Sequence, residues 1–128
     1  MKRINVPSGS KYEDIIGFSR AVKIGNIIAV AGTAPINEDG STCGINDLYV
    51  QTKKCFQITK KAIEDAGGNL SNVIRTRIML TNINDWEIAA KVHGEFFTDI
   101  KPVCTFVEVN GFCNKEWLVE TEVDCVSE

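Results

Sequence analysis

The sequence predicts an α+β fold in which a mixed six-stranded sheet carries two helices on one of its faces. Three observations support this prediction. Six short segments show apolar runs or apolar–polar alternation, as strands do. Two longer segments place apolar residues at spacings of three and four, as helices do. Each of these helices stands between two strands, which is typical of right-handed crossovers onto one face of a sheet.

The 128-residue chain is expected to form one domain over residues 1–128, because no linker or repeat interrupts it. Hydrophobic residues make up 44% and charged residues 24%, which is typical of a globular protein. The formal net charge is −3. The basic excess of a nucleic-acid-binding surface is therefore missing, and we expect no nucleic-acid partner. No signal peptide and no apolar run of about 18 residues is visible, so we expect no membrane segment and a cytoplasmic protein.

The five cysteines predict reduced thiols, because their number is odd and no Cys-x-x-Cys pair is present. They are Cys43, Cys55, Cys104, Cys113 and Cys125. A zinc site would need closer ligand spacing, and His93 is the only histidine. We therefore expect neither a metal nor another cofactor.

The first strands are expected near the N-terminal end. Residues 2–6 can form a short edge strand, and apolar runs follow at residues 21–24 and 27–33. Gly25-Asn26 between these runs is a two-residue hairpin signal, because glycine takes a positive φ at little cost. The small residues 31–35 end the hairpin. They either let a ligand or a neighbouring backbone come close, or they simply end a strand.

A helix is predicted over residues 47–66, where charged residues mostly avoid one face. Asn46 or Asp47 can cap its start, and Gly67 suits the left-handed position after its end. The face expected to be buried consists of Leu48, Thr52, Cys55, Thr59, Ala62, Ile63 and Ala66.

The second half predicts a strand over residues 73–81, a helix that ends near Phe97, and a last strand over residues 117–126. His93 lies at the centre of the apolar arc of this helix. It can be a hydrogen-bonded core histidine or a catalytic one.

The strand predicted over residues 103–109 follows Pro102, which can begin a strand but cannot lie in the middle of one. Within it, Cys104 is expected at the centre of any site. It is either an inert cysteine or a reactive thiol, and a reactive thiol would need a nearby cation or helix N-terminus.

Side-chain alternation assigns the two faces of the sheet. The helices are expected to cover the face that carries Ile74, Ile78, Leu80, Val107 and Val123. The opposite face is expected to carry Arg75, Arg77, Glu108, Glu120, Glu122 and Asp124, with Cys104 and Phe106 among them. Because exposing Phe106 together with Met79 and Leu118 would be unfavourable, we infer that this face meets other subunits.

Short motifs occur along nearly the whole chain, in an order that is typical of one protein family. They lie at residues 17–22 (Gly-Phe-Ser-Arg-Ala-Val), 25–26, 30–35 (Val-Ala-Gly-Thr-Ala-Pro), 51–52, 66–67, 80–81, 85–86, 95–97, 102–105 (Pro-Val-Cys-Thr) and 119–122 (Val-Glu-Thr-Glu). Their order and spacing resemble the RidA/YjgF family, also called the L-PSP endoribonuclease family. The resemblance implies a chorismate-mutase-like fold, assembled as a homotrimer with small-molecule pockets at the subunit interfaces.

The resemblance also implies which residues line the pocket. They are Phe18, Ala31, Gly32, Thr33, Ala90, Cys104, Thr105 and Phe106, with Glu120 at the position proposed to orient a hydrolytic water. Deaminating members carry an arginine in a Pro-Ala-Arg motif, whose planar fork holds the carboxylate of a 2-imino acid. Cys104 stands at that position here, and a neutral thiol cannot pair with a carboxylate.

Other pocket positions also depart from the family pattern. Phe18 replaces a tyrosine, Ala31 a serine, Ala90 an asparagine and His93 a tyrosine. The fold therefore carries over from the resemblance, whereas the enamine/imine deaminase chemistry does not.

Three functions stay open. The preferred one is a RidA-like homotrimer that binds a small metabolite with little or no catalysis. The second is a 2-imino acid deaminase, a hydrolase in which Glu120 activates water and a backbone amide near Gly32 or Thr105 positions the substrate. The third is the endoribonuclease activity that the family name implies, for which the sequence offers no paired histidines. A chaperone-like or regulatory protein–protein role is equally open.

Overall fold

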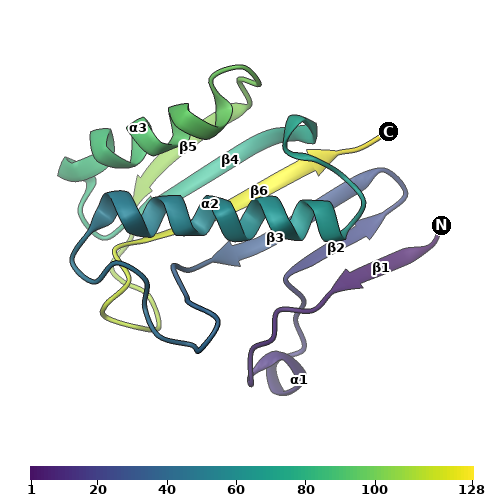
Figure 1. Cartoon of the computed structure of the whole chain (residues 1–128), viewed down its shortest axis with the longest axis horizontal. Coiled ribbons are helices and arrows are strands. Elements are labelled where there is room, and N and C mark those ends of the chain that lie inside the picture. The colour runs from purple at the N-terminus through teal and green to yellow at the C-terminus, as the bar shows by residue number, and fades with distance from the viewer.

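The computed structural model describes residues 1–128 as one sheet with two long helices packed on one face (Figure 1). The strands are β1 (Arg3–Val6), β2 (Ala21–Ile24), β3 (Ile27–Thr33), β4 (Val73–Leu80), β5 (Val103–Glu108) and β6 (Val119–Val126). Their order across the sheet is β1-β2-β3-β6-β4-β5. All neighbours are antiparallel except β4 and β5, which are parallel. The predicted mixed six-stranded α+β fold is therefore confirmed.

The long helices are α2 (Leu48–Asp65) and α3 (Trp86–Phe97), and the two 3-10 turns are η1 (Leu70–Asn72) and η2 (Ile83–Asp85). One further helical turn, α1 (Glu13–Ile16), was not predicted, because four residues are too few to show a helical period. None of the helices is both long and apolar enough to cross a bilayer.

Local sequence signals predicted several boundaries of strands and helices correctly. Ile24 pairs with Ile27 across the two-residue turn, in which Gly25 has φ of 60°. The Asp47 side chain caps α2 by accepting a hydrogen bond from the Val50 amide at 3.1 Å.

The core lies between the sheet and the two long helices. Its largest fully buried side chains include Phe56 and Ile63 from α2, Phe97 from α3, and Ile28 and Ile78 from the sheet. The predicted buried face of α2 is confirmed, and it also contains Gln51 and Phe56, which the prediction omitted.

His93 lies within this packing. Its Nε2 atom is 2.8 Å from the Thr76 hydroxyl oxygen, and its ring centroid is 4.7 Å from that of Phe97 and 5.7 Å from that of Phe56. This environment supports the interpretation as a hydrogen-bonded core histidine.

The face prediction for β5 was wrong in phase. In the parallel pair, Cys104 lies opposite Thr76 and Phe106 opposite Ile78, and paired residues point to the same face of a sheet. Thr76 and Ile78 are fully buried beneath the helices. The β5 residues on the helix face are therefore Cys104, Phe106 and Glu108, and those on the open face are Val103, Thr105 and Val107.

Ile74 was also assigned wrongly. A bulge separates Val73, which pairs with Cys125, from Arg75, which pairs with Asp124. The inserted residue shifts the alternation. As a result Val73 is buried on the helix face, whereas Ile74 is 51% exposed.

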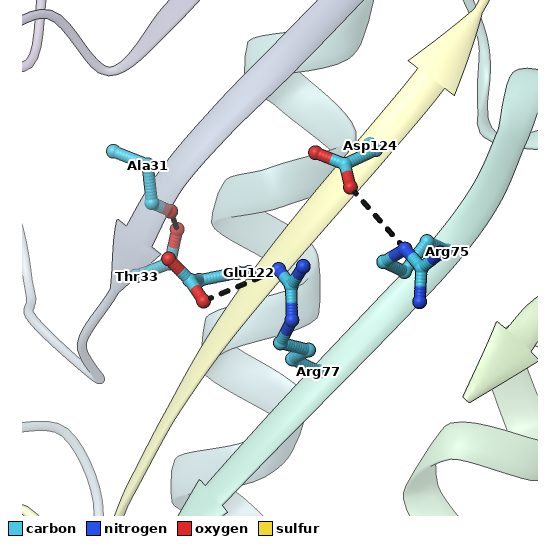
Figure 2. A network of polar contacts seen from close by, with 6 residues as sticks. All are labelled: Ala31, Thr33, Arg75, Arg77, Glu122 and Asp124. Atoms are coloured by element: carbon cyan, nitrogen blue, oxygen red, sulfur yellow. Dashed lines mark hydrogen bonds and ion pairs between the residues drawn. The ribbon is translucent and has the colours of Figure 1, made fainter. Parts of the chain in front are cut away.

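Glu120, Glu122 and Asp124 of β6 form an acidic stripe on the open face of the sheet, as predicted. Two arginines of β4 face this stripe (Figure 2). Arg75 Nε lies 3.7 Å from Asp124 Oδ2, and Arg77 Nη1 lies 3.5 Å from Glu122 Oε1. These partly exposed pairs contribute little to stability. They do neutralise the middle of the open face.

Candidate functional site

Glu120 lies on β6 at the end of the acidic stripe and is half-buried. Beside it β3 bulges, because Ala31 and Gly32 both lie between the pairs Val30–Val123 and Thr33–Thr121. A Cβ atom added at Gly32 would lie 3.2 Å from Glu120 Oε1. Because Gly32 has no side chain, the Glu120 carboxylate has space beside β3. The Glu120 carboxylate makes no hydrogen bond and no ion pair with the rest of the chain, so its oxygens are available to a ligand or water.

Arg20, directly before the neighbouring strand β2, holds the bulged end of β3. Its carbonyl accepts a hydrogen bond from the Ala31 amide at 2.9 Å. Its Nη1 donates to the Gly32 carbonyl at 3.3 Å and to the Thr33 hydroxyl at 3.1 Å. The Thr33 hydroxyl donates in turn to the Ala31 carbonyl at 2.8 Å, a bond drawn in Figure 2. These contacts gather Ala31, Gly32 and Thr33 into one polar corner next to Glu120.

Arg20 is not among the site residues that the sequence predicts. It lies within the motif at residues 17–22. The sequence did offer one signal for Arg20. This cation stands directly before β2, and the strand that pairs with β2 ends in small residues. Its closeness to Glu120 depends on the pairing of β3 with β6, which no local pattern reveals.

The two charged groups of this corner affect each other. Burial raises the pKa of Glu120, the Arg20 charge lowers it, and Glu122 raises it further, with a net upward shift. Burial lowers the pKa of Arg20, and the Glu120 charge opposes that shift. No Arg20 nitrogen lies within 4.0 Å of a Glu120 oxygen, so the two groups are neighbours without forming an ion pair.

Three predicted site residues lie elsewhere, beside α3. Phe106 packs with ring centroids 5.7 Å from Trp86 and 6.5 Å from His93. Cys104 is exposed on the same strand, and Ala90 is half-buried on α3. Because β4 separates β5 from β6, this group is about 10 Å from Glu120 in the sheet.

Thr105 and Phe18 are also apart from Glu120. Thr105 faces the open side of the sheet, opposite Arg77. Phe18 lines a polar hollow of about 370 Å³ near α1, together with Asn5 and Glu13. One chain thus brings together Ala31, Gly32, Thr33 and Glu120, and it leaves Phe18, Ala90, Cys104, Thr105 and Phe106 outside this corner.

The thiols divide by burial. All five cysteines are unpaired. Burial raises the pKa of Cys55, and it raises that of Cys125 to about 12, so neither is a nucleophile at neutral pH. Cys104 and Cys113 are exposed. No group of three or more His, Cys, Asp or Glu side chains is arranged to hold a metal ion.

Comparison with known proteins gives concordant results. The profile of the family described as Endoribonuclease L-PSP matches residues 9–127. An uncharacterised protein of Streptomyces coelicolor is 39% identical over 93% of this chain and 88% of its own. The 3-aminoacrylate deaminase RutC of Acinetobacter baylyi is 28% identical over 93% of both chains. The crystal structure of Rv2704 of Mycobacterium tuberculosis, a member of the YjgF/YER057c/UK114 family, has a TM-score of 0.89 and 37% identity over 98% of this chain and 99% of its own.

Proposed function

Because this chain belongs to the endoribonuclease L-PSP family, which also contains relatives of YjgF and RutC, we propose that it is a homotrimer that binds a small metabolite beside Glu120. The observation that carries the proposal is the state of the Glu120 carboxylate. It is half-buried, has no partner in the chain, and faces the space that Gly32 leaves without a side chain. Solvent reaches its oxygens, so a ligand can replace water on them without breaking a bond within the chain.

The open face of the sheet supports the trimer. Its exposed apolar residues include Ile27 (60%), Val103 (58%), Val126 (40%) and Val107 (38%). An apolar groove of about 390 Å³ also lies there, lined by residues that include Val22, Ile24, Ile27 and Ala29. An apolar sheet face of this kind is expected to be covered, and β5 offers a free strand edge next to it.

Assembly would also complete the site. The predicted pocket residues fall into separate groups in one chain, with Glu120 in one and Cys104 in another. A neighbouring subunit packed on the open face would bring a second set of these residues close to Glu120. The ligand would then be bound at the boundary between two subunits.

A second candidate function is hydrolytic deamination of an imine or enamine, and the Glu120–Arg20 corner favours it. Water would add to the C=N carbon while Glu120 accepts its proton. This proton would pass to the nitrogen to give a carbinolamine. Glu120 would then move the hydroxyl proton to the amine, so that the C–N bond breaks and ammonia leaves with a carbonyl product. A carboxylate with a raised pKa is suited to both proton transfers. The RutC relative carries out a deamination by its name.

RNA cleavage, which the family description suggests, has less support from the residues. The net charge is −3, and the single histidine is packed in the core and bonded to Thr76. No second histidine is present to share acid–base catalysis.

A binding screen tests the first proposal. The labelled full-length protein is titrated with small polar metabolites, and its amide resonances are followed by NMR. Shifts are expected to cluster at Gly32, Thr33 and Glu120, and sedimentation should give three times the 14.1 kDa chain mass. A monomer at micromolar concentration, or ligands that all bind elsewhere, would contradict the proposal.

An imine-hydrolysis assay tests the second candidate. An amino-acid oxidase supplies the 2-imino acid, and semicarbazide traps what is not hydrolysed. Activity that Glu120→Gln abolishes would support deamination. A silent wild type that gains activity as Cys104→Arg would instead indicate a binding pocket that has lost this chemistry.

A further inference from the structure

Arg20, which lies within electrostatic range of Glu120 and Glu13, has an unused hydrogen-bonding edge. A guanidinium carries five N–H donors, of which two belong to each terminal nitrogen and one to Nε. Only Nη1 of Arg20 makes hydrogen bonds, to Gly32 and Thr33. The Nε and Nη2 donors have no partner in the chain, and solvent reaches them although the residue is half-buried.

The other arginines of the sheet differ from Arg20. Arg75 and Arg77 each lie close to a carboxylate of β6. Arg3 has no acidic partner either, but it is exposed on the edge strand β1 and bonds to Asn5. Arg20 is therefore the one arginine that is half-buried and has no carboxylate within 4.0 Å, although Glu120 and Glu13 act on it from farther away.

We propose that the Nε/Nη2 edge of Arg20 is the anion-binding part of this site and that its ligand carries a carboxylate. Arg20 would thus supply, from the start of β2, a cation that position 104 of β5 does not offer. This inference rests on the proposed binding function and specifies the class of ligand.

The geometry suits a carboxylate. The Nε and Nη2 donors lie side by side in one plane, and this edge forms two parallel hydrogen bonds with a planar carboxylate. The bonds from Nη1 to the Gly32 carbonyl and the Thr33 hydroxyl fix the plane of the guanidinium before a ligand arrives. Little ordering of the side chain is then needed on binding, which favours affinity.

Glu120 limits when the anion can bind. A ligand carboxylate held by Arg20 would come within electrostatic range of the Glu120 and Glu13 carboxylates, so it would be repelled when they are charged. Burial raises the pKa of Glu120, and its protonation removes this repulsion. Binding of a carboxylate is therefore expected to strengthen as the pH falls towards the pKa of Glu120.

The test compares pyruvate with pyruvamide, which differ in having a carboxylate or a neutral amide at the same position. Both are titrated into the labelled full-length protein at fixed salt and pH, and inorganic phosphate serves as a tetrahedral anion. Pyruvate is expected to shift the Gly32 and Thr33 amides and to bind about tenfold or more tightly than pyruvamide. Phosphate should bind less tightly than pyruvate.

Variants provide the second arm. Arg20→Gln is expected to lose about tenfold or more of the pyruvate affinity, and Arg20→Lys to lose less because it keeps the charge. Arg3→Gln, which removes an exposed arginine, is the matched control and should bind as the wild type does. If Arg20→Gln fails to fold, the comparison of pyruvate with pyruvamide on the wild type still decides.

The outcomes separate the two proposals. Equal affinity for pyruvate and pyruvamide, unchanged binding by folded Arg20→Gln, or tighter binding of phosphate would each overturn the carboxylate assignment. In those cases binding beside Glu120 would still stand. If no compound of any charge shifts Gly32, Thr33 or Glu120, the binding function itself is overturned.

Discussion

Gly32 and Glu120 lie so close together that a Cβ atom at position 32 would stand 3.2 Å from Glu120 Oε1. This contact joins the bulge of β3 to the carboxylate of β6, and it makes the size of residue 32 a determinant of the site.

Replacing Gly32 with alanine should therefore reduce ligand binding more than stability. Gly32 does not have a positive φ, so alanine introduces no backbone strain. The Glu120 side chain can move by a few tenths of an ångström, at less than about 1 kcal/mol of unfolding free energy. Ligand affinity, measured by NMR titration, is expected to fall about tenfold, or ~1.4 kcal/mol. Gly111→Ala, at a position with open space around it, is the control and should change neither quantity.

Glu120→Gln should raise stability at neutral pH. Burial raises the pKa of Glu120 above its ordinary value of 4.5, so the folded state binds more protons than the unfolded state between the two pKa values. The charged carboxylate therefore lowers the free energy of unfolding above this window. Urea unfolding should show a stability advantage of Glu120→Gln at pH 7, which shrinks as the pH falls towards 4.5. An advantage that does not depend on pH would contradict the assigned cause.

The local sequence patterns that predicted the helices and strands do not predict the corner formed by Gly32, Thr33 and Glu120. Hydrophobic period, the Gly25-Asn26 turn and the Asp47 cap are local properties, and each gave the correct element. The phase of β5 depends instead on its register against β4, which places Phe106 opposite Ile78. Side-chain alternation alone fixes two faces but not which of them the helices cover.

Bulges limited the prediction in the same way. One extra residue near Ile74 moved that side chain out of the core, and another in β3 brought Gly32 to Glu120. Neither insertion has a signature in the alternation of a single strand. Arg20 was missed for a related reason, since its nearness to Glu120 follows from the pairing of β3 with β6.

Gln51 is expected to be a main support of the site. It is fully buried, and its Nε2 donates to the carbonyls of Gly44 (3.2 Å) and Glu116 (2.9 Å). Its Oε1 accepts from the Leu118 amide at 2.8 Å, directly before β6. Gln51→Leu leaves two part-buried backbone groups without partners, the Glu116 carbonyl and the Leu118 amide, whereas the Gly44 carbonyl keeps its bond from the Asp47 amide. It should reduce the free energy of unfolding by roughly 2 kcal/mol.

Thr59→Val is the matched control for Gln51→Leu on the same helix. The Thr59 hydroxyl is buried without any hydrogen-bond partner, so an isosteric apolar side chain should leave stability unchanged or raise it. Urea unfolding of both variants measures the difference. Similar losses in the two would show that burial, rather than hydrogen bonding, decides stability at this face of α2.

Stability should also depend on pH through His93. Burial lowers its pKa below the ordinary value of 6.5, so the unfolded state binds more protons as the pH falls below 6.5. The contribution of His93 is complete above 6.5 and is lost as the pH falls through the folded pKa. His93→Gln can still bond to Thr76 but does not titrate. Its urea midpoint should therefore fall less between pH 7.5 and 5.5 than that of the wild type, and equal losses would rule out His93 as the source.

The open face should control assembly if it is the subunit interface. Val107 is 38% exposed there, on the edge strand β5, and an aspartate at this position would be buried without a partner in a trimer. Val107→Asp is therefore expected to sediment as a monomer at micromolar concentration while its helical and strand content stays unchanged by circular dichroism. Ile88→Asp, at a residue 44% exposed on α3, should remain trimeric. Because the ligand site is proposed to need a second subunit, Val107→Asp should also lose binding beside Glu120 even though Gly32, Thr33 and Glu120 are untouched. A monomer that still binds would mean that one chain carries the complete site.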